Sequence, residues 1–309
     1  MTEAVYPIVF STDDNYAYYI TVTIESLLET TNANQRLDIY ILYEHLNPKS
    51  LHLFQSLCQE RLTVTPIQIH AGDIFSIAYE SDYFTMAMYY RLLIADLLPQ
   101  YDKVLYIDCD IIFRKNVSKL FEIDLNGYVM GAVYEYMDQG LKDYLCSIGF
   151  MSSHYFNSGV LLINCSLFRL EQIAVKCMKQ LKSNTKYKYP DQDILNIVCK
   201  GKVFPIPTEW NFKPFYSYSK KQLLGEDLVQ YKLDRDNPAL IHYTSGFKPW
   251  YYPEKLFSKL WWETAIHLKE TYGKTGVHIY SVIKRNLKKF QIRQLLHGYR
   301  ARIMGKKNE

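Results

Sequence analysis

The first third of the chain switches repeatedly between two hydrophobic patterns. Short apolar runs rich in β-branched residues predict buried strands, and longer segments with apolar residues at helical spacing predict helices. The predicted strands are Val5–Ser11, Leu37–Tyr43, Leu62–Ile69 and Lys103–Ile107, and the predicted helices are Tyr16–Glu29, Lys49–Gln59 and Met86–Leu98. This alternation is typical of βαβ units. We therefore expect an α/β fold with a largely parallel sheet and ligands at the carboxyl ends of its strands.

The pattern after residue 110 is more mixed. It predicts strands at Tyr128–Tyr134, Gly159–Asn164 and Ala239–Tyr243, and helices at Ser166–Leu181 and Asp191–Cys199. No internal repeat or flexible linker interrupts the sequence before about residue 270. We therefore predict one domain over residues 1–270 and a separate tail over residues 271–309.

The tail has a basic amphipathic pattern. Its apolar residues fall near helical spacing, and Lys and Arg fill much of the rest. The apolar positions are Ile279, Val282, Ile283, Leu287, Phe290, Leu295, Leu296, Tyr299 and Ile303. Such helices lie in anionic membrane interfaces, which is the interpretation we favour. A helix docked on the domain is the main alternative. A nucleic-acid-binding arm is the weakest, because nothing else in the sequence resembles such a module.

Charge also distinguishes the tail from the rest of the chain. The net charge is +4, but residues 284–309 contain nine Lys or Arg and one Glu, so the first 283 residues carry −4. No apolar run is long enough to predict a transmembrane helix, and no signal peptide is evident at the N-terminus. The six cysteines form no C-x-x-C pair, which favours free thiols in a reducing cytosol. We therefore expect a cytoplasmic protein associated with the inner face of the membrane.

Two acids follow the strand at Lys103–Ile107. Asp108 and Asp110 are spaced i, i+2, so on an extended chain both side chains point to the same side. Two converging carboxylates suit a hard cation such as Mn²⁺ or Mg²⁺, whose open positions phosphate oxygens can fill. The alternative is a solvated acidic turn, because the D-x-D pattern is short and common.

Four further polar segments lie at strand ends or in loops. Three have a simple structural explanation, and in the fourth a lone His is more often structural than a ligand. Helix capping explains acids in Ser11–Tyr16 and Tyr189–Leu195, and a tight turn explains Gly159 in Phe156–Gly159. In the stretch from Ile241 to Trp250, His242 precedes Lys248 by six residues, which suggests a metal ligand beside a phosphate contact. Each segment is modest alone, and it is their conjunction that matters.

Taken in order, the motifs resemble the bacterial lipooligosaccharide galactosyltransferase and glycogenin family of retaining glycosyltransferases. The shared strings are F-S-T-D-D-N-Y at 10–16, Y-Y-R-L at 89–92, K-V-L-Y-I-D-C-D at 103–110, F-N-S-G-V-L-L-I-N at 156–164, D-Q-D-I-L-N at 191–196 and H-Y-T-S-G-F-K-P-W at 242–250. The resemblance covers about residues 5 to 262. It implies a single Rossmann-like domain of the GT-A type that binds a nucleotide sugar.

The resemblance also implies roles for individual residues. Asp108, Asp110 and His242 are expected to bind Mn²⁺, with Mg²⁺ as a substitute, and Lys248 and Gly246 to contact the diphosphate. The segment with Ser11, Asp13, Asn15 and Tyr16 is expected to hold the uridine. Four residues are expected to line the donor sugar: Arg91, Asn157, Asp191 and Gln192. Of these, Gln192 and Asp191 are expected to be the catalytic pair.

These roles predict a retaining enzyme that transfers a hexose from a UDP-sugar, with galactose preferred and glucose next. The expected acceptor is a surface glycan, with a lipid-linked one such as lipooligosaccharide favoured, and no nucleic acid is expected as a partner. A glycosyltransferase acting on protein adhesins and a non-catalytic nucleotide-sugar-binding module are the alternatives. A Rossmann dehydrogenase is a weaker one, because no G-x-G-x-x-G follows the first strand.

Overall fold

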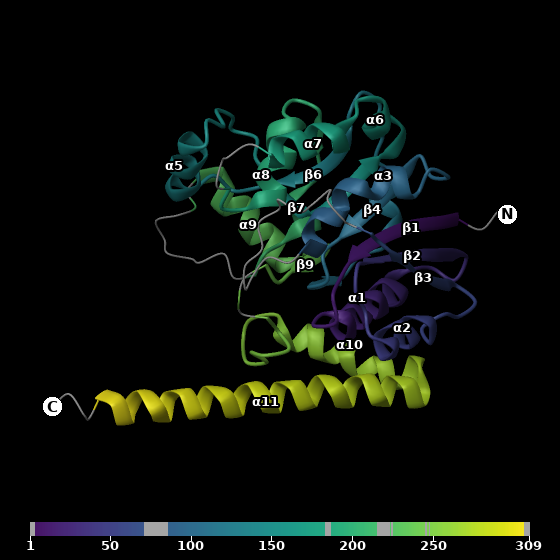
Figure 1. Cartoon of the computed structure of the whole chain (residues 1–309), viewed down its shortest axis with the longest axis vertical. Coiled ribbons are helices and arrows are strands. Elements are labelled where there is room, and N and C mark those ends of the chain that lie inside the picture. Colours follow the sequence, from purple (N-terminus) through teal and green to yellow (C-terminus); the bar gives the residue numbers. More distant parts are fainter. Residues whose placement is uncertain are drawn as a thin grey trace.

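The computed structural model describes residues 4–70, 86–182, 187–214, 223, 225–244, 246 and 248–305, with side chains described up to residue 296. The centre of the fold is a seven-stranded sheet in the order β3-β2-β1-β4-β7-β6-β8 (Figure 1). Its strands are β1 (Ala4–Ser11), β2 (Gln35–Tyr43), β3 (Leu62–Gln68), β4 (Lys103–Ile107), β6 (Met130–Tyr134), β7 (Phe156–Asn164) and β8 (Val203–Pro205). A second sheet pairs β5 (Ile111–Phe113) with β9 (Leu240–His242).

The main sheet is parallel in one half and mixed in the other. Strands β1 to β4 pair in parallel, as expected, but β7 runs antiparallel to both β4 and β6. Since β6 and β8 also pair in parallel, four of the six pairings are parallel, which confirms the expected largely parallel sheet. The α/β class and the Rossmann-like half are confirmed.

Both faces of the sheet are covered, because alternate residues of each strand point to opposite sides. Ile8 and Phe10 of β1 belong to one buried cluster, and Val9 between them belongs to another. Figure 1 shows α1 and α2 on one side of the sheet and α3, α6 and α7 on the other. The described helices are α1 (Ala17–Thr30), α2 (Pro48–Gln55), η2 (Met86–Leu93), α3 (Ile94–Leu97), α4 (Ser118–Phe121), α5 (Gln139–Ser147), α6 (Cys165–Leu170), α7 (Ile173–Leu181), α8 (Pro190–Val198), η3 (Thr208–Asn211), α9 (Gly225–Asp236), α10 (Ser258–Thr271) and α11 (Gly273–Gly305).

Three predicted helices differ in detail from the helices in the structure. The segment from Met86 is a 3₁₀ helix, η2, before it becomes the short α3. The segment expected to run as one helix to Leu181 divides into α6 and α7 at Gln172, whose φ of 53° is left-handed and ends regular helix. Helix α2 ends at Gln55, four residues earlier than predicted. All six cysteines are free, as expected.

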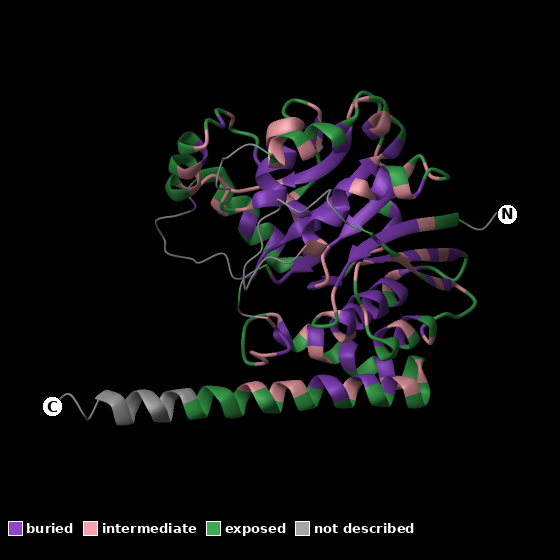
Figure 2. Ribbon diagram, in the orientation of Figure 1, coloured by how far each residue is buried: buried purple, intermediate pink, exposed green. Residues whose placement is uncertain are grey.

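The C-terminal helix α11 is docked along its first half. Ile279, Val282 and Ile283 are buried against α10 and α1, and Phe290 stacks on Tyr251 with ring centroids 4.5 Å apart. Farther along, the large apolar side chains face solvent, as the change in colour along α11 in Figure 2 shows. These exposed side chains are Ile292, Leu295 and Leu296. Among the described helices, none is both long and apolar enough to cross a membrane.

Candidate active site

A cleft of about 1160 Å³ opens beside the carboxyl ends of β1 and β4. It gathers the sequence motifs that are far apart along the chain. Of the predicted site residues, those that line it are Ser11, Asp13, Tyr16, Arg91, Asp108, Asp110, Asn157, Asp191, Gln192, His242, Gly246 and Lys248. Asn15 does not line the cleft; its side chain is exposed and its amide donates to Asp13.

Strand pairing brings His242 to the two acids. Asp108 and Asp110 lie in the short connection between β4 and β5, and β5 pairs antiparallel with β9 so that Ile111 is opposite His242. The His242 Nε2 lies 3.2 Å from Asp110 Oδ1 and 3.6 Å from Asp108 Oδ2. One ligand atom from each residue lies within 4.8 Å of the others, so the three side chains converge on one point.

Lys248 completes one side of this cluster. Its Nζ donates to the Asp110 carboxylate and, at 2.7 Å, to the backbone oxygen of Tyr243. Burial alone would raise the pKa of Asp110, but the positive charge of Lys248 and the contact with His242 bring that pKa well below its usual value. Asp110 is therefore ionised at neutral pH, as a metal ligand must be.

Arg91 joins the D-x-D connection to helix α8. Its Nη2 lies 3.0 Å from Asp108, and its Nη1 lies 3.1 Å from Asp191 and 2.6 Å from the backbone oxygen of Ser158. Burial would lower the pKa of the Arg91 guanidinium, but Asp108 and Asp191 raise it above its usual value. Arg91 is thus a buried, permanently charged clamp between two acids of the cleft.

The first turn of α8 presents Asp191 and Gln192 to the cleft, and both are held from β7. Asp191 accepts a hydrogen bond of 2.8 Å from Ser158 Oγ, and the Gln192 Oε1 accepts from Asn157 Nδ2 at 3.0 Å and from Ser158 N at 3.2 Å. The oxygen of Gln192 is therefore engaged by two donors of β7.

The segment around the end of β1 contains a local turn and a buried hydroxyl group without a hydrogen-bond partner among the described residues. The Asp13 carboxylate accepts hydrogen bonds from the backbone N–H groups of Asn15 and Tyr16 in a turn just before α1. The first turn of α1 has no side-chain cap and no acid, so the helix-capping interpretation is wrong for this segment. The Ser11 Oγ is buried and has no hydrogen-bond partner within the part of the chain that the structure describes. The Tyr16 ring packs edge-to-face against Trp250, beside the turn that carries Lys248, with ring centroids 5.9 Å apart.

Comparison with known proteins identifies this arrangement. Residues 7–253 match the sequence profile described as glycosyl transferase family 8. The chain belongs to glycosyl transferase family 8. This confirms the resemblance found in the motifs and shows a glycosyltransferase fold of the GT-A type.

Three relatives illustrate the match. A lipopolysaccharide 1,2-glucosyltransferase of Escherichia coli K12 is 30% identical over 263 residues, which cover 82% of this chain and 76% of the relative. A glycosyltransferase-like protein of Haemophilus influenzae is 32% identical over 210 residues, and the match spans 67% of this chain but only 63% of that protein. The structure of the galactosyltransferase LgtC with donor and acceptor sugar analogs aligns with a TM-score of 0.66 and 25% identity, covering 84% of this chain and 94% of LgtC.

The side chains of this family 8 member fit a divalent cation. Two carboxylates and one imidazole form a set of oxygen and nitrogen ligands suited to Mn²⁺ or Mg²⁺ and leave positions for other oxygen ligands. The cleft is also large enough for a nucleotide sugar.

The structure adds three residues, in or beside the site, to which the sequence motifs assign no role. Asp193 is fully buried, and both of its carboxylate oxygens accept hydrogen bonds, from the hydroxyls of Tyr144 and Tyr155. It thereby ties α8 to α5 and to the residue that precedes β7. Glu135 and Lys213 form an ion pair in the wall of the cleft. Pairing between such distant positions could be found only from the folded chain.

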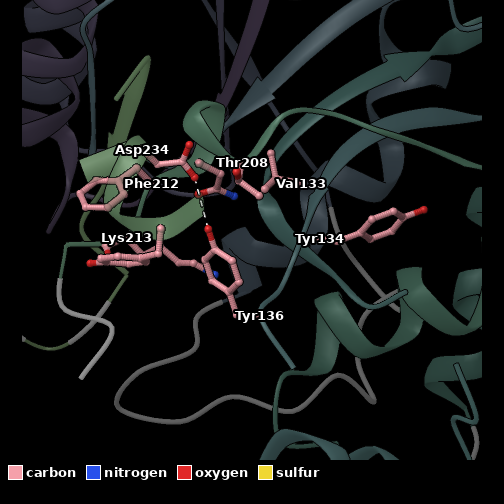
Figure 3. Close-up of a pocket in the computed structure, with 9 residues that line it drawn as sticks. Val133, Tyr134, Tyr136, Thr208, Phe212, Lys213 and Asp234 are labelled. Atoms are coloured by element: carbon pink, nitrogen blue, oxygen red, sulfur yellow. Dashed lines mark hydrogen bonds between the residues drawn. The ribbon is translucent and has the colours of Figure 1, made fainter. Parts of the chain in front are cut away.

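A second cavity, of about 10 Å³, lies behind this wall and has room for about one water molecule. Lys213 and the buried Asn211 line it together with residues of β6 and α9. Figure 3 shows Tyr136 and Asp234 pointing toward each other, joined by a hydrogen bond of 3.2 Å. Burial and the nearby Asp234 raise the pKa of Tyr136, so the phenol stays a neutral donor.

Proposed function

We propose that this chain is a retaining, Mn²⁺-dependent glycosyltransferase that transfers a hexose from a UDP-sugar to a hydroxyl group of a glycan. Galactose is the preferred hexose and glucose the next. The observation that carries the proposal is the convergence of Asp108, Asp110 and His242 beside Lys248, in the same cleft as Asp191 and Gln192. The names of the relatives, which are glucosyl- and galactosyltransferases, support a hexose donor.

Each residue has a distinct part in the proposed reaction. Asp108, Asp110 and His242 hold the metal ion, which when bound offsets the charge that develops on the UDP leaving group. Lys248 adds a second positive charge at the diphosphate. The Ser11 hydroxyl and the Tyr16 ring contact the uridine. Asn157 and Gln192 form the wall beside the sugar, and Arg91 keeps the acids of this wall in place.

The contacts of Asp191 favour front-face transfer over a double displacement. Its carboxylate is paired with Arg91 and accepts from Ser158, so it is held and charge-neutralised rather than poised to attack. In front-face transfer the departing phosphate oxygen takes the proton of the acceptor hydroxyl, and the new glycosidic bond forms on the face that UDP leaves. A sugar–enzyme adduct on Asp191, detected by mass spectrometry, would overturn this mechanism.

The first experiment measures UDP release from a panel of UDP-sugars with and without Mn²⁺. We expect turnover with UDP-galactose or UDP-glucose that needs the metal ion and is lost in EDTA. Absence of metal-dependent turnover or hydrolysis with every hexose donor would favour the non-catalytic binding module instead.

The variant that tests the metal site is Asp110→Asn. It removes a charged ligand while keeping the shape of the side chain, and turnover should fall at least about 100-fold. The matched control is Asp102→Asn, an exposed acid that accepts a hydrogen bond from Ser166 outside the cleft. Circular dichroism should show both variants folded. Unchanged Mn²⁺-dependent turnover in Asp110→Asn would refute the metal site.

We also propose that the exposed end of α11 binds an anionic membrane surface on the cytoplasmic side and that the acceptor is lipid-linked. Ile292, Leu295 and Leu296 expose apolar surface next to Lys288, Lys289 and Arg293, a combination that suits an interfacial helix. Replacing the three apolar residues by Asn should abolish flotation with phosphatidylglycerol vesicles and leave the melting temperature unchanged. Full vesicle binding by that variant would contradict the assignment.

A further inference from the structure

Asn211 is a buried amide placed directly beside His242. It is the last residue of η3 and is 2% exposed. Phe212, which follows it, forms an isolated parallel bridge with Ile241 and accepts a hydrogen bond of 2.8 Å from the backbone N–H of His242. This backbone pairing fixes where the Asn211 side chain lies relative to the His242 ring.

A chain of hydrogen bonds runs from His242 to Gln192 through two asparagines. The His242 Nδ1 lies 2.8 Å from the Asn211 Oδ1. The Asn211 Nδ2 donates to the Asn157 Oδ1 at 2.9 Å, and the Asn157 Nδ2 donates to the Gln192 Oε1 at 3.0 Å. Three side-chain amides thus connect the metal-ligand cluster to the wall formed by α8.

Two backbone N–H groups of β7 fix the direction of this chain. The oxygen and nitrogen of a side-chain amide are told apart by their partners, and a backbone N–H can only donate. Gly159 N donates to the Asn157 Oδ1 at 3.0 Å, and Ser158 N donates to the Gln192 Oε1 at 3.2 Å. The Asn157 oxygen therefore accepts from Asn211 as well, and the Asn211 oxygen is left facing His242.

The direction of the chain determines the tautomer of His242. An amide oxygen can only accept, so the His242 Nδ1 must carry a proton. In the neutral ring the Nε2 then keeps its lone pair, and this is the atom that faces Asp108 and Asp110. A histidine that binds a metal ion through Nε2 needs this tautomer, and the residue that accepts from its other nitrogen orients the ring.

We propose that Asn211 is a positioning residue of the active site, which holds His242 in its metal-binding tautomer and, through Asn157, sets the orientation of the Gln192 amide. The proposal rests on the proposed function, because it takes His242 as a metal ligand. One buried amide then serves two parts of the reaction, the metal ion and the wall beside the donor sugar.

Two substitutions at this position separate the two effects. Asn211→Ala removes both hydrogen bonds, so Mn²⁺ affinity and kcat should each fall about 10–100-fold. Asn211→Asp keeps an oxygen that accepts from His242 Nδ1 but presents no donor to the Asn157 oxygen. It should retain Mn²⁺ binding, while kcat falls as in the Ala variant.

The experiment measures Mn²⁺ binding by isothermal titration calorimetry in the presence of UDP, which needs no turnover, together with UDP-release kinetics. The control is Asn116→Ala, which removes an amide that bonds to Gln35 and Ser118 far from the cleft and should bind Mn²⁺ as the wild type does. Circular dichroism identifies the folded variants, and the Asp variant decides the matter if the Ala variant does not fold.

The outcomes distinguish this inference from the proposed function. If the wild type binds Mn²⁺ with UDP but folded Asn211→Ala binds it equally well, Asn211 does not position His242 and only this inference fails. Equal loss of Mn²⁺ affinity in the Ala and Asp variants would also overturn it. If the wild type itself binds no Mn²⁺ in the presence of UDP, the proposed function fails and the inference falls with it.

Discussion

Gly159 offers the sharpest test of the metal site, because there is no room for a side chain at this position. A Cβ atom built on Gly159 would lie 2.3 Å from Cε1 of His242 and 2.5 Å from Oδ2 of Asp108. Its φ is not in the left-handed region, so alanine can adopt the backbone conformation without strain. The substitution Gly159→Ala therefore acts through this steric contact alone.

The size of the effect follows from the geometry. The closest ordinary contacts of a Cβ are about 3.4 Å, so the ring or the carboxylate must move by about 1 Å. Metal sites tolerate ligand displacements of only about 0.2 Å. Inserting a methyl into a packed region costs about 1–3 kcal/mol, part of which alanine offsets by its better strand propensity than glycine. We expect a folded protein whose Mn²⁺ affinity is at least about 10-fold weaker.

The assay combines calorimetric Mn²⁺ titration in the presence of UDP with thermal unfolding. The control is Gly140→Ala, since Gly140 also lines the cleft but its added Cβ would meet only the Asp138 carboxylate, at an ordinary 3.4 Å. That variant should bind Mn²⁺ as the wild type does. If Gly159→Ala is folded and binds Mn²⁺ with unchanged affinity, the proposed position of the ion between Asp108 and His242 is wrong.

Two further predictions concern α11 and the α1–α10 interface. Phe290→Ala removes ring contacts with Tyr251 and Tyr252, worth about 0.5–1.5 kcal/mol each, beside the turn that carries Lys248. The KM for the UDP-sugar should therefore rise about 3–10-fold, whereas Leu295→Ala, at an exposed position, should leave KM unchanged. Equal KM values for the two variants would refute a coupling between α11 and this turn. Burial raises the pKa of Glu25 to about 7 from its ordinary 4.5, so the stability that this group contributes below about pH 4.5 is lost as the pH rises through 7. Thermal unfolding of Glu25→Gln should lack up to about 3 kcal/mol of this pH-dependent loss in the free energy of unfolding. The same dependence of stability on pH in the variant and the wild type would contradict the prediction.

The parts of the site that are predictable from sequence are those carried by local motifs. Asp108 and Asp110 directly follow a clear strand, and the carboxyl end of a parallel strand is where ligands bind. The resemblance added His242 and Lys248, which are more than 130 residues away, and the structure brings both to the same cleft. The reason for their proximity is the pairing of β5 with β9. The sequence predicts the strand at Ala239–Tyr243, but no local pattern indicates that the three-residue strand β5 is its partner.

The residues that sequence reasoning missed act through long-range pairing. Asn211 lies in an irregular segment rich in proline and aromatic residues, and only the bridge between Phe212 and Ile241 places it against His242. A tight turn explains Gly159 from the sequence alone, whereas in the structure it lies within β7 and the atoms nearest to an added Cβ belong to His242 and Asp108. Which chain segment faces a glycine depends on strand register, which the sequence does not specify locally.

The amphipathic pattern of the tail cannot tell docking from membrane binding, because both bury one apolar face of a helix. In the structure the first half of α11 is docked on the domain, whereas Ile292, Leu295 and Leu296 farther along are exposed. Gly276 lies so close to α10 that an added Cβ would be 1.7 Å from the Leu268 oxygen, and among the side chains described up to residue 296 Phe290 is the last that stacks on the domain. A truncation before Ile279 would therefore expose the core as well as remove the apolar end. Membrane binding has to be tested by substitutions beyond Phe290, where a loss of binding cannot be a loss of folding.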